Sequence, residues 1–474
     1  MFKRIWNWLA KPSPRRLTYN PGSMPVMDRK FDWPAIPSAD DGETQSPSAR
    51  PPYSADATGA PTDKNPARRR RKELIREVFD PSRPVDGRFG LSGREEELNR
   101  LIDAVLFEHK HGIVFGPRGS GKTSLARAFG DIADGDGATV LYNSAGGNLS
   151  FVDLFRPFLR ELANSSTHLA RTPAMQQLLG DGFDASLLAS SLAETVTRRT
   201  IFLVDEFDRI ESPTIKAEVA ALMKLLSDMR SNITVIIIGI AGNLDDLLCG
   251  HPSLRRHLTS ISLAGLAIED QRQLLQSCCD RSGLTIDADA AHNIRVAAIG
   301  SPYHIRLFGL YAALVAERSE STHITNETVE AGFSSALGYW SELNFDGFRE
   351  LSLYVDRHPA SLLSSTIACW LAAMHGRFTQ KTVTEMLIAE RIATTPVHAA
   401  RRFEEMLREC DFLFHRSPSD DSYSVRDTLL PQFFILMLQG VRPPSRKSDG
   451  IDPALSVILA DERASEFTLK GAAG

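Results

Sequence analysis

Eight consecutive residues, from Gly116 to Thr123, have the spacing Gly-x-x-x-x-Gly-Lys-Ser/Thr. The apolar run Gly112–Phe115 leads into this segment, and residues typical of a helix follow it. Strand, loop and helix in this order are the context that the Walker A pattern requires. Glycines let successive backbone N–H groups turn toward phosphate oxygens, and the dipole of the following helix favours the same negative charge. The residues that we expect around the phosphates of a nucleotide are Gly116, Pro117, Arg118, Gly119, Ser120, Gly121, Lys122, Thr123 and Ser124.

A second motif ends in two carboxylates. The apolar run Thr200–Val204 is typical of a buried strand, and Asp205 and Glu206 follow it at once. Behind a Walker A segment, this pattern indicates the Walker B motif. Glu206 is expected to orient and polarise the water that attacks the γ-phosphate. Asp208 is a third carboxylate nearby, and we expect it to lie at the surface or to support the other two.

The two motifs together predict which cofactors the chain binds. A Walker A lysine contacts the β- and γ-phosphates, and the hydroxyl beside it shares Mg²⁺ with an acidic residue at a strand end. Lys122 is therefore expected at the phosphates, and Thr123 and Asp205 at the metal, Asp205 through a water molecule. We expect the chain to bind ATP and Mg²⁺ and to hydrolyse ATP to ADP and phosphate.

Five short apolar runs alternate with longer amphipathic stretches in the part of the chain that carries both motifs. This alternation predicts an α/β fold with a mainly parallel sheet. After Leu266 the pattern contains helices alone, which predicts a small helical domain. The expected strands are Gly112–Phe115, Thr139–Asn143, Ile201–Val204, Thr234–Ile240 and Ser260–Leu263. The expected helices of the second domain are Glu269–Ser282, Ala288–Ala298, Pro302–Ser319 and Thr325–Leu337.

Residues 344–440 have a third pattern. Helical stretches, notably Ala360–His375 and Pro396–Cys410, precede two short β-like runs, Phe412–His415 and Tyr423–Arg426. Helices followed by a hairpin with a polar tip favour a winged helix. These residues carry 10 basic and 12 acidic side chains, a net charge of about −2, whereas a DNA-reading domain normally has a basic face.

The chain has 474 residues, of which 42% are hydrophobic and 24% charged. These values are ordinary for a soluble globular protein and exclude a collagen-like, disulfide-dense or wholly disordered chain. The net charge of −5 hides an asymmetry, because residues 1–72 carry about +7 and the remainder about −12. Residues 1–66 hold 11 of the 26 prolines, which predicts a disordered linker over 12–66. Five scattered cysteines without a Cys-x-x-Cys spacing fit a reducing cytosol, so we expect a cytoplasmic protein.

Two features of the basic tail leave alternatives open. Phe2, Ile5, Trp6 and Leu9 would share one face of a short basic helix. Such a helix could lie on an anionic membrane or dock into a partner protein, and the terminus could equally be unstructured. The basic run Arg68–Lys72 could bind nucleic acid or anionic lipid, or it could be a solvated charge run at a domain edge.

With these motifs the chain resembles the AAA+ superfamily, and within it the bacterial ATPases that are similar to origin-recognition initiators. The resemblance covers roughly residues 79–340. Phe89–Glu95 is similar to the Gly-Arg box that precedes the first helix of the family, and the segment before it, Phe79–Val85, would lie beside the adenine. A winged helix often follows the lid in these relatives.

The resemblance also implies three further catalytic residues. Asn243, which follows a predicted strand, looks like sensor 1, a polar residue that contacts the γ-phosphate and the water. His251–Leu258 resembles the segment with the arginine finger, so Arg256 would reach the γ-phosphate of a neighbouring subunit. Gly300–Arg306 is similar to the start of the lid helix that holds sensor 2, although Arg306 falls one turn later than the usual arginine.

These inferences divide the chain into five parts. The predicted parts are a disordered basic tail over 1–72, a nucleotide-binding base over 73–265, a helical lid over 266–343, a winged-helix-like domain over 344–440 and a flexible C-terminal tail over 441–474.

The resemblance implies an ATPase that works as a molecular switch. ATP binding would drive association of identical subunits and of a protein partner, and hydrolysis would reset the switch. An ATP-gated protein that binds DNA through the winged helix is an alternative, weakened by the charge of residues 344–440. A membrane-tethered ATPase that uses Phe2–Leu9 and the arginine run is another.

Overall fold

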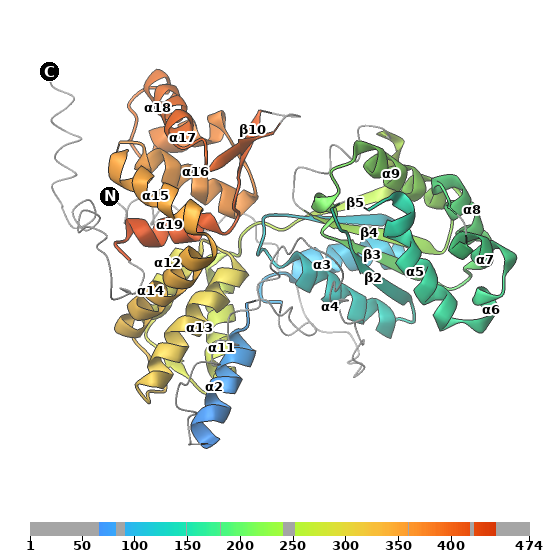
Figure 1. The fold of residues 1–474 in the computed structure, drawn as a ribbon, viewed down its shortest axis with the longest axis horizontal. Coiled ribbons are helices and arrows are strands. Elements are labelled where there is room, and N and C mark those ends of the chain that lie inside the picture. The colour runs from blue at the N-terminus through green and yellow to red at the C-terminus, as the bar shows by residue number, and fades with distance from the viewer. Residues whose placement is uncertain are drawn as a thin grey trace.

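The structure, a computed structural model, describes most of the chain (Figure 1). The described residues are 66–81, 91–147, 149–180, 182–239, 252–358, 360–417 and 421–441. The amphipathic segment Phe2–Leu9, the predicted linker up to residue 65 and most of the predicted C-terminal tail lie outside them. Within the described ranges, no helix combines the length and the apolar character that crossing a membrane requires.

The large sheet has five parallel strands in the order β2-β3-β4-β1-β5. The strands are β1 His111–Phe115, β2 Thr139–Ser144, β3 Thr200–Asp205, β4 Ile233–Gly239 and β5 Leu258–Ser262. All residues of β3 and β4 are buried, as expected for parallel strands that helices cover on both faces. The prediction of an α/β fold with a mainly parallel sheet is therefore confirmed.

Two layers of helices cover the sheet. Alternate residues of β3 enter opposite cores, because successive side chains of a strand point to opposite faces. Ile201 and Leu203 enter the core with α3 and α4, whereas Phe202 stacks at 4.7 Å on Phe158 of α5. The first layer contains α3 Glu95–Ile102, the π-helical turn η3 Asp103–Phe107 and α4 Lys122–Gly135. The second contains α5 Phe151–Ser165, α6 Thr167–Ala170, α7 Pro173–Gly180, α8 Ala185–Thr195 and α9 Pro213–Asp228.

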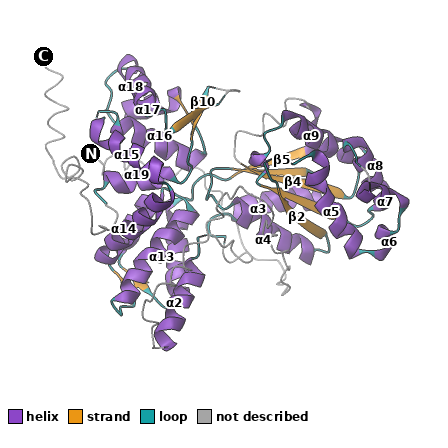
Figure 2. Cartoon of the chain, in the orientation of Figure 1, coloured by secondary structure: helices purple, strands orange, loops and turns teal. Residues whose placement is uncertain are grey.

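A second region, the lid, lies beside the sheet region and is almost wholly helical (Figures 1 and 2). Its helices are α11 Ile268–Ser282, α12 Ala288–Ala298, α13 Pro302–Arg318 and α14 Asn326–Leu343. Helix α2 Pro66–Phe79, from before the sheet in sequence, packs beside α11 and α13 in this region (Figure 1). The first described helix thus belongs to the lid, the following residues form the sheet region, and the chain then returns to the lid.

Helix α2 corrects the prediction that residues 1–72 form a disordered tail, because residues 66–72 are helical. Arg68 Nε lies 3.0 Å from Glu317 Oε1, and Lys72 Nζ lies 3.6 Å from Glu317 Oε2. The Glu317 side chain is only 2% exposed, and a buried carboxylate is costly unless cations pair with it. Part of the basic run therefore attaches α2 to the lid, a contact that the charge pattern alone does not reveal.

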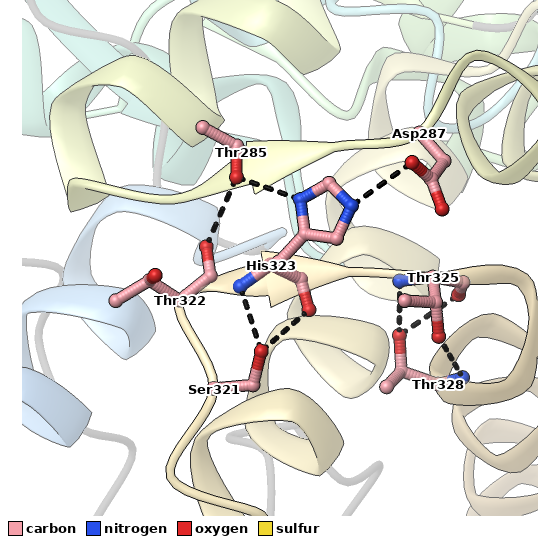
Figure 3. A network of polar contacts seen from close by, with 7 residues as sticks. All are labelled: Thr285, Asp287, Ser321, Thr322, His323, Thr325 and Thr328. Atoms are coloured by element: carbon pink, nitrogen blue, oxygen red, sulfur yellow. Dashed lines mark hydrogen bonds and ion pairs between the residues drawn. The ribbon is translucent and has the colours of Figure 1, made fainter.

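Two short strands contradict the prediction that the lid contains helices alone. Strand β6, Thr285–Ile286, pairs in parallel with β7, His323–Ile324. Figure 3 shows the His323 ring between the two strands, where its Nδ1 lies 2.7 Å from Thr285 Oγ1 and its Nε2 lies 2.9 Å from Asp287 Oδ1. Two-residue strands leave no period in the sequence, so pattern analysis misses them.

The C-terminal region combines helices with a small antiparallel sheet. The sheet has the order β8-β10-β9, and its β9–β10 hairpin lies where the sequence predicts one. The helices are α15 Phe345–Arg357, α16 Leu362–His375, α17 Gln380–Ala389, α18 Pro396–Glu409 and α19 Leu430–Leu438. The strands are β8 Phe378–Thr379, β9 Phe414–Arg416 and β10 Ser422–Val425. Among these helices the sequence-based expectation names only α16 and α18 individually, and it does not include strand β8.

Helix α19 joins the C-terminal region to the lid. All nine of its residues are buried. Phe433 stacks on Trp340 of α14 with ring centroids 4.9 Å apart, and it meets Phe308 and His304 of α13 edge to face. A single apolar core therefore runs through both regions. Because close-packed side chains resist relative displacement, we expect lid and C-terminal region to move together.

A tight turn lies where the sheet region, the lid and the C-terminal region meet. Gly265 N donates to Met374 O at 2.8 Å, and Leu266 N donates to Gly300 O at 2.8 Å. Gly300 has a φ of +72°, in the left-handed region that favours glycine. A Cβ on Gly300 would lie 2.9 Å from Met374 Sδ and 3.0 Å from Gly265 Cα. Both the conformation and the close approach require glycine here.

We predict that Gly300→Ala lowers the free energy of unfolding by about 2 kcal/mol, because a left-handed L-residue is strained and the added methyl displaces backbone atoms. Gly347→Ala is the matched control, since Gly347 lies in α15, where an added Cβ would meet no atom within 4 Å and alanine is the better helix former. Urea unfolding of both variants measures the difference. Equal stability of the two variants would contradict the prediction.

Candidate nucleotide and magnesium site

The Walker A segment connects β1 to α4, as the sequence predicts. Gly121 precedes α4 with a φ of +93°, and because glycine has no side chain, the first helical N–H groups, from Lys122 to Ser124, have no capping side chain from this position. Backbone N–H groups at a helix N-terminus attract anions. The loop therefore has the geometry to hold phosphate groups at the carboxyl edge of the sheet.

Lys122 lies over this loop. Its Nζ donates to Gly116 O at 3.0 Å and to Pro117 O at 2.9 Å. Burial lowers the pKa of Lys122, while the negative charges of Asp208 and Asp205 oppose that shift. The two carbonyls thus hold the ammonium group at the loop, where it can pair with phosphate. Of the two positions that the sequence suggests for Asp208, at the surface or supporting the other two carboxylates, its electrostatic influence on Lys122 favours the second.

Asp205 and Thr123 lie together, as predicted. Thr123 Oγ1 donates to Asp205 Oδ2 at 2.8 Å, the Tyr142 hydroxyl donates to the same oxygen at 2.8 Å, and Glu206 N donates to Asp205 Oδ1 at 2.7 Å. Hydroxyl and carboxylate oxygens are ligands that Mg²⁺ accepts, and Mg²⁺ usually takes few protein ligands beside water and phosphate. The pair therefore fits a magnesium ion shared with a nucleotide.

Glu206 lies just beyond Asp205, at the edge of the sheet. Its φ is +53°, an uncommon backbone conformation for a residue other than glycine, and the 3-10 turn η4 Phe207–Arg209 follows it. Ser144 Oγ donates to Glu206 Oε2 at 2.9 Å, and Arg209 Nη1 lies 3.2 Å from the same oxygen. The side chain is 43% exposed, so its carboxylate is accessible to water.

Arg94 of the Gly-Arg box is buried beneath the Walker A loop. Its Nη2 donates to Ser120 O at 3.2 Å and also to Ala264 O, and its Nη1 donates to Glu97 Oε1 at 3.1 Å. Burial lowers its pKa, and Glu97 partly offsets that shift. One guanidinium thus joins α3, the loop and the segment that follows β5. The sequence indicates the box but not this bracing role.

The lid contacts the Walker A loop through the start of α13. Tyr303 N and Ser301 Oγ both donate to Gly119 O at 3.5 Å, and a Cβ on Gly119 would lie 3.0 Å from Ser301 Oγ. Arg306, the predicted sensor 2, is 9% exposed and donates to Asp80 O at 3.4 Å. The structure therefore brings Tyr303, one turn earlier, against the loop, whereas Arg306 bonds to the segment that precedes the Gly-Arg box.

Arg256, another of the predicted residues, lies apart from this cluster. Arg256 is exposed in the 3-10 turn η5 Pro252–His257, which the buried Leu254 attaches to the sheet region. Asn243 lies outside the described residues. Leu258, two residues after Arg256, pairs with His111 at the amino end of β1, whereas the Walker A loop leaves the opposite end. Arg256 is thus at the far edge of the sheet from its own loop.

Tyr142 and Ser144 are site residues that sequence reasoning missed. They occupy alternate positions at the carboxyl end of β2, and Ser144 pairs in register with Asp205. Three polar side chains, Tyr142, Asn143 and Ser144, gather at the carboxyl end of β2, and the first and third share one face of the strand. That signal alone does not reveal that β2 is the neighbour of β3.

Residues 105–248 match the family model of the AAA domain. Over these residues the chain is similar to the AAA domain. The matched range contains the Walker A loop, Asp205 and Glu206, so the predicted AAA+ resemblance is confirmed. The AAA domain implies nucleotide binding, usually with Mg²⁺, and supports nucleotide hydrolysis. A comparison with curated proteins finds no match.

Several solved structures are similar to the chain. The Walker-type ATPase PABY2304 of Pyrococcus abyssi has 15% identity and a TM-score of 0.48, over 76% of this chain and 99% of that one. The Orc1 protein of Aeropyrum pernix, solved in complex with DNA, has 15% identity and a TM-score of 0.41, over 76% and 96%. Cdc6p from Pyrobaculum aerophilum has 17% identity and a TM-score of 0.41, over 77% and 99%.

We predict that Arg94→Lys weakens nucleotide binding by the AAA domain about tenfold, because one ammonium group cannot replace a guanidinium that bonds to three groups. The melting temperature is expected to fall by roughly 5 °C. Arg100→Lys is the matched control, since Arg100 lies on α3, the helix that Arg94 immediately precedes, and its Nη2 makes an exposed bond to Ser260 O. Titration with a fluorescent ATP analogue measures the affinity. Wild-type affinity in Arg94→Lys would refute the bracing role.

Proposed function

We propose that the chain is a Mg²⁺-dependent ATPase that works as a molecular switch. The observation that carries this proposal is the alignment of Thr123, Asp205 and Glu206 beside the Walker A loop. Thr123 and Asp205 hold the metal, Lys122 contacts the β- and γ-phosphates, and Glu206 orients the attacking water. The metal would neutralise charge on the phosphate oxygens as the terminal phosphoryl group leaves.

We further propose that two copies of the chain complete each site. Arg256 is exposed and lies at the edge of the sheet opposite to its own loop, so it suits a nucleotide held by a neighbouring subunit. A fixed cation there stabilises the charge that spreads over the transferring phosphoryl group. Head-to-tail contacts of this kind generate rings or open helical assemblies. Asn243 and Arg306 remain proposed contacts on the side of the subunit that binds the nucleotide.

The switch would act through the lid. ATP lies between base and lid in this proposal, and α13 already contacts the Walker A loop through Ser301 and Tyr303. The apolar core that lid and C-terminal region share would carry a lid movement into the C-terminal region. A protein partner that binds one position of this region better than the other would then be controlled by the nucleotide.

We propose that the C-terminal region is a winged helix that contacts protein rather than DNA. The order α16, β8, α17, α18 and then the β9–β10 hairpin supports the winged-helix assignment. On α18, Arg401 Nε lies 3.4 Å from Glu405 Oε1, and Arg402 Nη1 donates to Ala360 O. These arginines already have partners within the chain, which leaves less basic surface for phosphate contacts.

We predict that Glu206→Gln retains ATP binding but lowers turnover by at least about 100-fold, because the amide cannot act as a base toward the attacking water. Lys122→Ala is expected to weaken ATP binding about tenfold or more, because it removes charge-assisted bonds to phosphate. Phosphate release and equilibrium binding measure the two effects separately. Full turnover in Glu206→Gln would refute its role.

We predict that mixing two inactive variants restores hydrolysis. Arg256→Ala alone is expected to lower turnover on the order of 10³-fold. In a mixture with Glu206→Gln, some interfaces combine an intact Glu206 with an intact Arg256, so random mixing is expected to recover about a quarter of the wild-type rate.

Arg255→Ala is the matched control, since Arg255 is an adjacent exposed arginine of the same turn, and we expect it to keep its activity. Failure of the mixture to recover activity, with both variants folded, would mean that Arg256 does not act between subunits.

A further inference from the structure

The side chain of Tyr142 reaches from β2 to the carboxylate that is proposed to hold magnesium. Tyr142 pairs in register with Leu203, two residues before Asp205. Because residues at alternate positions share one face of a sheet, Tyr142 and Asp205 both lie on the face that α4 covers. Thr123 belongs to that helix, so three neighbouring elements direct one polar side chain each to the same point.

The hydrogen bonds of Asp205 leave little freedom to its carboxylate. An ionised carboxylate offers about four acceptor positions on its two oxygens. Oδ2 accepts from both Thr123 Oγ1 and the Tyr142 hydroxyl at 2.8 Å, and Oδ1 accepts from Glu206 N at 2.7 Å. Without Tyr142, rotation of the carboxylate would be opposed by Thr123 and one backbone N–H only. Asp205 is 4% exposed, so water is poorly placed to replace the lost donor.

The residues around Tyr142 fix the position of its hydroxyl even when no ligand is bound. The ring packs against the apolar core between the sheet and α4. The guanidinium carbon of Arg127, one helical turn after Thr123, lies 5.9 Å from the ring centroid. A phenol hydroxyl is protonated near neutral pH, and that of Tyr142 donates to Asp205 Oδ2 at 2.8 Å.

We propose that Tyr142 is a positioning residue for magnesium: its hydroxyl holds Asp205 in the orientation that Thr123 shares, so that the metal binds without reorganising the carboxylate. This inference rests on the proposed ATPase function and deepens it. The phenol contacts neither nucleotide nor water in this role. It acts through Asp205, and its effect is therefore expected in the affinity for Mg²⁺ rather than for ATP itself.

The test uses the full chain carrying Glu206→Gln, which is expected to bind ATP without turnover. Tyr142→Phe keeps the ring and removes only the hydroxyl. Binding of a fluorescent ATP analogue is titrated with Mg²⁺, and separately measured in EDTA. We expect Tyr142→Phe to raise the Mg²⁺ concentration at half-saturation about tenfold, because it removes a hydrogen bond to a charged group, and to leave affinity in EDTA within twofold.

A double-substitution cycle with Asp205→Asn decides whether the effect passes through Asp205. In the Asp205→Asn background, Tyr142→Phe is expected to change the Mg²⁺ midpoint by less than twofold. An undiminished effect there, an unchanged midpoint in Tyr142→Phe alone, or an equal loss of affinity in EDTA would each overturn the positioning role. Melting temperatures without nucleotide verify that all variants are folded.

The same experiment separates this inference from the proposed function. If the parent Glu206→Gln chain shows no Mg²⁺-dependent nucleotide binding, the proposed ATPase site is wrong, and the role of Tyr142 falls with it. If the parent binds as expected while Tyr142→Phe has the same midpoint, the ATPase proposal stands and only the positioning role is refuted.

Discussion

The carboxylate of Asp205 is the point on which the arrangement of the site depends. It is buried at the end of a central strand, and a buried carboxylate is costly unless hydrogen-bond donors satisfy it. Its donors are side chains of α4 and β2 and the backbone N–H of Glu206, the next residue. The carboxylate meets these donors only when β2 lies beside β3 in the observed register and when Thr123 of α4 faces the sheet. The Walker A loop, which precedes α4, is thereby set beside the two acidic residues.

A second constraint acts at the other end of the molecule. The α13 helix begins against the Walker A loop, and its middle packs on α19 from the C-terminal region. Phe433 and Trp340 stack within one apolar core that the lid and the C-terminal region share. Helix α13 and the side chains packed against it therefore connect the phosphate site to the C-terminal region. Such packing transmits displacement because it leaves few voids.

Much of the AAA domain could be predicted because its signals are local. The five strands are short apolar runs, and the buried residues of β3 and β4 explain why those runs are continuous. The two-residue strands β6 and β8 could not be predicted, since they are too short to establish a period. The arginines of helix α2 give it a strongly polar sequence that is typical of a tail. Their partner Glu317 is about 250 positions away in the chain, and its ion pairs attach the helix to the lid.

The sequence by itself determined the phosphate loop and the order of the acidic residues, because backbone conformation and strand ends are encoded by neighbouring residues. Only the tertiary structure decided that Tyr142 and Ser144 join Asp205 and Glu206, that Tyr303 rather than Arg306 meets the loop, and that α19 fills the core of the lid. These contacts join residues far apart in the chain. Their selection depends on strand order and helix packing, which arise from burial of apolar surface over the whole molecule.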